Sequence, residues 1–112
     1  MRYTDEQRIQ KILNTGHKLM QLVEDKHLTK ALVMTDEYLQ WAITTPLYNI
    51  GENVYQLSNE YKNAHPGIAW MRIAGLRHRL VHDYDNTNWS IICDVVFDEL
   101  PELLQALEET EM

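Results

Sequence analysis

Apolar residues recur at intervals of three and four along most of this 112-residue chain, which is the period of an amphipathic helix. The first such stripe follows Thr4-Asp5-Glu6-Gln7, a sequence typical of a capping box, in which two side chains satisfy free amides of a first helical turn. This stripe predicts a helix over residues 4–26. No segment alternates apolar and polar residues as a half-buried strand would. The periodicity therefore predicts an all-α protein.

A second stripe predicts a helix over residues 36–62. Pro46 lies inside this segment, where it removes an amide donor and is expected to kink the helix. Residues 28–34, between the two helices, fit either a turn of helix or a loop. Gly16 weakens the first helix locally and indicates a kink or a close contact with another helix.

The second half of the chain predicts two more helical stretches. After a Pro-Gly breaker, residues 68–83 are expected to be helical in two pieces hinged near Gly75. Asn88 is the expected cap of a last helix, and Pro101 can begin a new segment within it. The expected fold is a four- to five-helix, up-and-down-like bundle that forms a single domain over residues 1–112.

Acidic residues are concentrated at the C-terminal end. The chain has 17 Asp and Glu against 10 Lys and Arg, a net charge of −7, and the segment from Asp94 to Met112 contains no Lys or Arg. This balance excludes a general nucleic-acid coat, which needs a broad basic surface, and the segment is expected to form a solvated helix face and tail. Cys93 is the only cysteine, which excludes an internal disulfide. With no membrane-spanning apolar run and no secretory leader, we expect a soluble, cytoplasmic protein.

One short segment is nevertheless rich in basic residues: Arg72, Arg77, His78, Arg79 and His82 fall within eleven positions. An Arg can clamp a phosphate oxygen, and a neutral His can take the proton from a ribose 2′-hydroxyl. Attack of that oxygen on the adjacent phosphate would cleave RNA and leave a 2′,3′-cyclic phosphate. Arg77 and His82 are five residues apart, which is about 140° around an ideal α-helix. A bend, a helix end or a second subunit must therefore bring them together.

Other chemistry-bearing residues have ordinary explanations. His78 and His82 could share a helix face, but no Glu follows His78, so the zinc-protease pattern fails. The glycines are isolated and form no phosphate loop, and we expect neither a metal nor a cofactor. Large side chains are expected to pack, as core or interface anchors for Trp41, Trp70 and Trp89, and as gap-fillers for Met20, Met34 and Met71.

The motif Arg77-x4-His82-x-Tyr84 matches the RX4HXY motif of the HepT-like toxins, a branch of the HEPN superfamily of all-helical ribonucleases. Asn49-Ile50-Gly51-Glu52, Pro66-Gly67-Ile68-Ala69-Trp70 and Leu100-Pro101 are similar to further landmarks of that family, in the same order. The resemblance covers residues 36–107. It implies a HEPN-type homodimer in which the motifs of two subunits face each other across the two-fold axis.

The resemblance implies that Arg77 and His82 are the catalytic pair of a metal-independent endoribonuclease. His78 and Arg79 are expected to be auxiliary residues of that site; His78 stands where the family commonly has another polar residue, Asn. Glu52 falls on the Gly-Glu landmark, which implies a structural contact to the motif helix rather than a catalytic role.

Tyr84 resembles the tyrosine to which the cognate antitoxin, a minimal nucleotidyltransferase called MntA, attaches AMP. Such a modification would put bulk and negative charge two residues from His82, where RNA phosphate must approach. The chain is then the toxin of a type VII-like toxin–antitoxin pair. Two alternatives remain at this point: a non-catalytic helical partner or substrate-binding subunit of a nucleotidyltransferase, and a helical dimerisation domain without catalysis.

Overall fold

The computed structural model describes residues 2–82 and 86–111, and it describes the backbone alone at positions 81, 82 and 111. Its elements are all helices and lie in this order: α1 (Asp5–Asp25), α2 (Lys30–Thr35), α3 (Glu37–Gln56), α4 (Asn59–Ala64), α5 (Trp70–Ala74), the π-helix η1 (His78–His82), α6 (Trp89–Asp94), the π-helix η3 (Val95–Glu99) and α7 (Leu100–Glu111). The all-α prediction is confirmed. Within the described ranges, no helix is long and apolar enough to cross a membrane.

Helix α1 begins where its sequence predicts. The Thr4 hydroxyl accepts a hydrogen bond from the Gln7 amide (3.1 Å), and the Gln7 side chain accepts one from the Thr4 amide (2.9 Å). The capping box is therefore present on both sides. Gly16 faces α7, and a Cβ built on Gly16 would lie 2.5 Å from a methyl group of Leu104. Gly16 thus permits the close helix contact that was one of its two expected roles.

The prediction of one helix over residues 36–62 is wrong at its C-terminal end. Helix α3 ends at Gln56, and Leu57 turns its buried side chain into the core with an extended backbone. Ser58 then caps a separate short helix, α4, by accepting a hydrogen bond from the Tyr61 amide (3.1 Å). The apolar period continues across the break, so periodicity alone does not reveal it. Pro46 lies inside α3, which continues past it.

The Gly75 hinge is confirmed, because α5 ends at Ala74 and Gly75 is its C-terminal cap. In the last helix, Asn88 caps α6 by accepting bonds from the Ser90 and Ile91 amides (3.0 and 3.3 Å). The π-helix η3 precedes Pro101, which has no amide proton to continue an α-helical ladder. The amide of Leu100 donates to the Val95 carbonyl five residues earlier.

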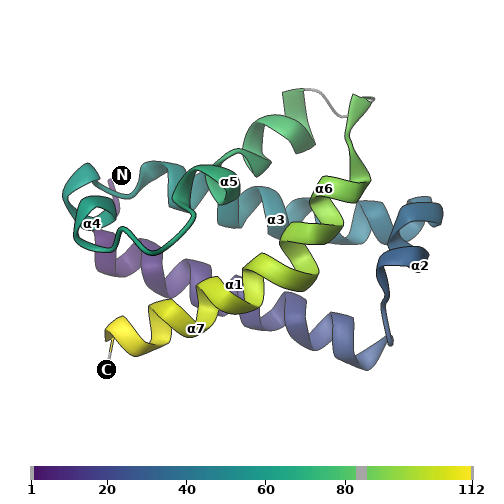
Figure 1. The fold of residues 1–112 in the computed structure, drawn as a ribbon, viewed down its shortest axis with the longest axis horizontal. Coiled ribbons are helices and arrows are strands. Elements are labelled where there is room, and N and C mark those ends of the chain that lie inside the picture. Colours follow the sequence, from purple (N-terminus) through teal and green to yellow (C-terminus); the bar gives the residue numbers. More distant parts are fainter. Residues whose placement is uncertain (1, 83–85, 112) are drawn as a thin grey trace.

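The long helices enclose one apolar core. Helix α1 packs along one side of α3, and α5 packs against the other side (Figure 1). Helix α7 crosses α1. The largest fully buried side chains come from these four helices and also from η1 and α6, and they include Ile9, Ile12, Leu47, Ile50, Ile73, Leu80, Ile92 and Leu107. Helix α2 resolves the ambiguity over residues 28–34 in favour of a helical turn, and it packs against α6.

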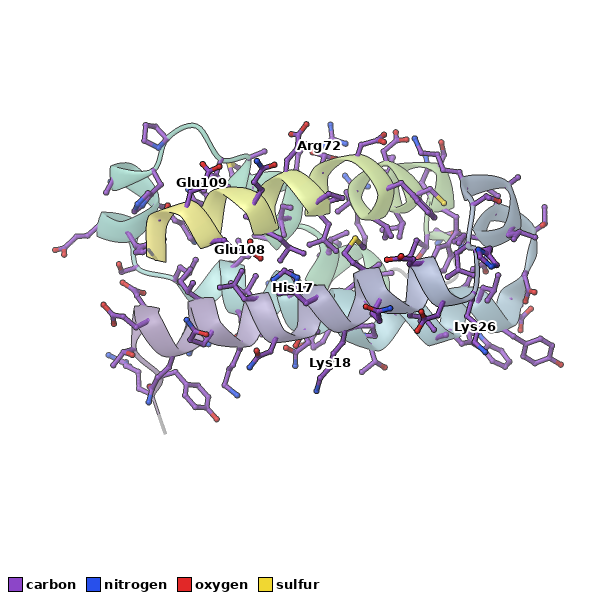
Figure 2. All side chains as sticks on the ribbon, turned by 90° about the horizontal axis from the view of Figure 1, so that it is seen from below. His17, Lys18, Lys26, Arg72, Glu108 and Glu109 are labelled. Atoms are coloured by element: carbon purple, nitrogen blue, oxygen red, sulfur yellow. The ribbon has the colours of Figure 1, made fainter. Side chains whose placement is uncertain are left out.

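Ion pairs tie the acidic C-terminal segment to the rest of the bundle. Figure 2 shows α7 running beside α1, where His17 Nε2 lies 2.5 Å from Glu108 Oε1. Lys30 reaches both Asp94 (3.2 Å) and Asp98 (2.8 Å). The prediction of a merely solvated acidic face is therefore incomplete, since part of this charge is used to hold helices together.

Candidate active site

Arg77 lies just after the Gly75 hinge and points back toward α3. Its Nε donates to Glu52 Oε2 at 2.7 Å. The guanidinium carbon lies 4.2 Å from the centre of the Tyr55 ring, which is within the range of a cation–π contact. Glu52 and Tyr55 are three residues apart on α3 and so present their side chains on one helix face. Together they hold the guanidinium while leaving about a third of the Arg77 side chain exposed.

Gly51 explains how the motif segment comes so close to α3. A Cβ built on Gly51 would lie 3.0 Å from the Ile73 carbonyl oxygen and 3.1 Å from the Arg77 amide nitrogen. Such distances are shorter than ordinary van der Waals contact, so a side chain here would push the two helical segments apart. The Gly-Glu pair thus has two roles: Gly51 allows the close approach, and Glu52 uses it to reach Arg77.

The ion pair shifts both of its members toward their charged forms. The hydrogen bond from Arg77 lowers the pKa of the Glu52 carboxyl, and burial opposes this shift only in part. The same bond raises the pKa of Arg77 above its already high ordinary value. A further hydrogen bond from Gln56 Nε2 to Glu52 Oε1 (3.2 Å) fixes the carboxylate on its other oxygen. The charge of Arg77 is permanent under any physiological condition.

The backbone of His82 follows Arg77 through a π-helical turn. Residues 78–82 form η1, and the hydrogen-bond repeat of a π-helix is five residues rather than four. Arg77 directly precedes η1, and a π-helix turns through a smaller angle per residue than an α-helix, so positions 77 and 82 diverge less than they would on an ideal α-helix. The angular separation of about 140° expected for an α-helix does not apply here. Tyr84 lies outside the described residues.

His78 and Arg79 lie on different sides of the motif segment. His78 is exposed and lines, with Arg77, a cleft of about 350 Å³ between α3, α4 and α5. Arg79 is also exposed but lines a second cavity of about 490 Å³ toward α6, together with Arg72 and Asp94. The structure thus places His78, but not Arg79, in the cleft beside Arg77. Arg72 is held by Glu99 at 2.8 Å.

Sequence reasoning missed two residues that surround Arg77. Tyr55 stacks on its guanidinium, and Lys62 lines the same cleft from α4. A signal for Tyr55 existed, because it follows Glu52 by three residues on a predicted helix. Lys62 could not be found in this way, since its position depends on the break at Ser58. Within the described part of the chain, no group of three His, Cys, Asp or Glu side chains could hold a metal.

Three large apolar side chains that were expected to pack are exposed in the described chain. Trp41 is 51% exposed and Met71 is 90% exposed, and Met34 is exposed as well. The gap-filler prediction is wrong for Met34 and Met71, whereas for Trp41 the exposure excludes the core and leaves the interface anchor as the other expected role. Trp70 is buried as expected, and its indole N–H donates to the carbonyls of Lys62 (3.2 Å) and His65 (3.0 Å).

Comparisons with known proteins agree on one family. A family model described as ribonuclease HepT-like matches residues 7–110. The chain is 33% identical over 94 residues to "Putative RNase TTE0752" of Caldanaerobacter subterraneus subsp. tengcongensis, a match that covers 84% of this chain and 74% of the relative. It is 29% identical over 76 residues to "Probable ribonuclease HepT" of Thermococcus cleftensis, covering 68% and 69% of the two chains. No solved structure gives a significant match.

Proposed function

The chain belongs to the family of HepT-like ribonucleases, and on that premise we propose that it is a metal-independent endoribonuclease with Arg77 and His82 as its catalytic pair. Arg77 binds the scissile phosphate, and His82 takes the proton from the neighbouring 2′-hydroxyl. The 2′-oxygen then attacks phosphorus, and the 5′-oxygen leaves and takes a proton from solvent water, so that the products carry a 2′,3′-cyclic phosphate and a 5′-hydroxyl. Developing negative charge on the phosphate oxygens is stabilised by the guanidinium.

The observation that carries this proposal is the way Arg77 is held. The Glu52 contact engages Nε, one of five N–H donors on the guanidinium. The terminal nitrogens are the donors that would meet a phosphate in a bidentate manner. The Tyr55 ring lies 4.2 Å from the guanidinium carbon, and this contact limits the motion of the side chain, so less side-chain entropy is lost when a phosphate binds. A surface arginine without such support would have to be ordered by its substrate.

The proposed enzyme is a homodimer that uses the N-terminal part of α3 as its contact surface. Exposed or half-buried residues recur there at spacings of three and four: Tyr38, Trp41, Thr45 and Tyr48. Tyr38 and Trp41 form an edge-to-face pair with ring centres 5.4 Å apart. Large aromatic residues at the surface are typical of interface anchors. Glu52 follows Tyr48 by four residues on the same helix and binds Arg77, so the proposed contact surface ends beside the candidate site.

Modification of Tyr84 is the proposed control of the enzyme. An AMP group on this residue adds negative charge and bulk two positions from His82, which repels and occludes RNA phosphate. The group would come from ATP through a partner nucleotidyltransferase of the MntA type, the antitoxin of a toxin–antitoxin pair. Tyr84→Phe should retain RNA cleavage but no longer accept label from ATP in the presence of such a partner. Labelling that persists in this variant would place the modification on another residue.

Cleavage in EDTA tests the central proposal. Wild type, His82→Ala and a matched control, His27→Asn at an exposed turn residue, are incubated with RNA after mass spectrometry has shown that Tyr84 carries no AMP. EDTA-resistant cleavage with cyclic phosphate ends in wild type and His27→Asn, lost in His82→Ala, supports the endoribonuclease. No cleavage by folded, unmodified wild type refutes it and favours the non-catalytic binding partner of a nucleotidyltransferase.

The dimer has its own test. Trp41→Glu puts a charge into the proposed contact surface and should convert the dimer to a monomer in sedimentation experiments. It should also abolish cleavage, because each site needs the second copy. Leu32→Glu on α2 is the control, since Leu32 is a similarly exposed apolar residue outside the row on α3. A Trp41→Glu variant that stays dimeric excludes this surface as the contact.

A further inference from the structure

The cleft beside Arg77 contains groups to which the proposed reaction gives no role. It lies between the C-terminal end of α3, α4 and α5, and Figure 1 shows α4 at one end of the molecule with α5 above α3. Its volume of about 350 Å³ falls at the lower end of the range for small-ligand sites, which is suitable for one nucleotide. Besides Arg77 and His78, its lining includes Tyr55, Lys62, Trp70 and Met71.

Lys62 gives the cleft a cation without a close carboxylate. Its Nζ donates to the Tyr55 carbonyl oxygen (3.1 Å), and among the described residues no Asp or Glu oxygen lies within 4.0 Å of it. Burial holds the pKa of the Lys62 ammonium below its ordinary value, and the more distant charge of Asp5 opposes this shift. A partly desolvated cation in this state gains more from an anion than a solvated lysine does.

The cleft also presents exposed apolar side chains. Tyr55 is 51% exposed and Met71 is 90% exposed, although Met is among the residue types that are most often buried. Trp70 also lines the cleft, and its indole is held in place because the N–H is bonded to two backbone carbonyls. An exposed ring and thioether beside cations are the combination with which proteins bind unpaired nucleotides: the base stacks and the phosphate is neutralised.

We propose that this cleft binds the nucleotide adjoining the scissile phosphate, with its base against Tyr55 and Met71 and its phosphate at the Lys62 ammonium. The proposal rests on the proposed function, because Arg77, which also lines the cleft, holds the phosphate that is cleaved. The ligand is thus a single-stranded stretch of RNA, since a paired base cannot enter the cleft. A free nucleoside monophosphate shares this chemistry and is distinguished by experiment.

Binding of a non-cleavable RNA, measured by fluorescence anisotropy at several salt concentrations, tests the cleft independently of catalysis. A short single strand with 2′-O-methyl groups throughout cannot undergo the reaction. Lys62→Gln should weaken binding about fivefold and lower the slope of log affinity against log salt by about 0.7, the value for one phosphate contact on a single strand. Lys18→Gln is the matched control, because Lys18 is an exposed lysine of α1 (Figure 2), and it should leave the slope unchanged.

Substitutions of Tyr55 separate the base from the phosphate. Tyr55→Phe keeps the ring and should bind like wild type, whereas Tyr55→Leu should weaken binding by about fivefold or more with an unchanged salt slope. A smaller slope in Tyr55→Leu would mean that Arg77 has moved, which overturns the base contact. Equal affinity of wild type, Lys62→Gln and Tyr55→Leu overturns the whole proposal, as does the absence of RNA binding by wild type.

Two further measurements distinguish RNA from a free nucleotide as the ligand, and separate binding in the cleft from the proposed cleavage. Titration with 5′-AMP alone should give much weaker binding than the oligonucleotide; equal affinity would make the cleft a free-nucleotide site and overturn the assignment to RNA. His82→Ala should bind the non-cleavable strand like wild type. If His82→Ala still cleaves ordinary RNA, the catalytic proposal fails while the Lys62 and Tyr55 results continue to report on the cleft.

Discussion

Replacing Gly51 with alanine is the most direct way to disturb the approach of α3 to the motif segment. Alanine in a helix interior is usually favoured over glycine by about 1 kcal/mol. Here its methyl group would meet the Ile73 carbonyl oxygen at 3.0 Å, the Arg77 amide nitrogen at 3.1 Å and the Leu76 Cβ at 3.2 Å. Two of these atoms belong to the backbone of a packed helical segment and cannot rotate away.

Overpacking of this kind costs about 1–3 kcal/mol, which exceeds the gain in helix propensity. We therefore expect Gly51→Ala to lower the free energy of unfolding by about 1 kcal/mol, and the melting temperature by about 4 °C for a domain of this size. The same displacement lengthens the bond between Glu52 and Arg77, so RNA cleavage should fall further than the folded fraction explains.

Urea unfolding followed by circular dichroism measures the change, and Gly67→Ala is the matched control. A Cβ on Gly67 would have no heavy atom within 4 Å, and no described glycine has a positive φ. This control should keep the wild-type free energy of unfolding within about 0.5 kcal/mol. A Gly51→Ala protein that is as stable as the Gly67→Ala protein and equally active would refute the reasoning, because the close approach would then impose no constraint.

Three further predictions concern charge and capping. Glu52→Gln should keep the fold but reduce RNA cleavage about tenfold or more, since Arg77 loses its charged partner; unchanged kinetics would contradict a positioning role for Glu52. Hydrogen bonds from Ser58 lower the pKa of Asp5, so their stabilisation is present above the unfolded-state pKa and fades as the pH falls through the lower folded-state pKa. Ser58→Ala should therefore destabilise the protein more at pH 7 than at pH 3 in thermal melts, and equal losses would exclude this linkage. Asn88→Ala removes the cap of α6 and should cost about 1 kcal/mol in urea unfolding, while Asn88→Asp should restore most of it.

Local signals predicted most of the helices. The Thr4 capping box, the Asn88 cap and the hinge at Gly75 each depend on residues within about one helical turn, and the structure has all three. The one helix predicted over residues 36–62 was wrong at Ser58 because the prediction rested on apolar periodicity. The apolar period continues through the break, and the local sign of a new helix is the Ser58 cap, which accepts a hydrogen bond from the Tyr61 amide.

The candidate site was predicted as a set of residue types but not as an arrangement. The spacing of Arg77 and His82 indicated phosphate chemistry, while an ideal α-helix would have turned the two residues apart. Apolar periodicity does not distinguish a four-residue from a five-residue hydrogen-bond repeat, so the π-helical turn of η1 could not be foreseen.

Exposure was the property that the sequence predicted least well. Trp41 and Met71 have large apolar side chains of the kind found in cores and interfaces, yet both are exposed at the surface. Whether a large apolar side chain is buried depends on which other helix covers its face, and that is decided by packing between distant segments. The exposure of Trp41 supports the proposed dimer surface, and the exposure of Met71 supports the proposed nucleotide cleft.

By itself, the sequence determined that the chain is all-α, where most of its helices begin, and to which family it belongs. These properties follow from interactions between residues a few positions apart and from a motif of fixed spacing. Only the tertiary structure decided that Glu52 pairs with Arg77 across 25 residues, that Gly51 lets their helices meet, and that Lys62 and Tyr55 share a cleft with them. Contacts of this kind depend on how helices pack in three dimensions, and no local pattern of residues encodes their geometry.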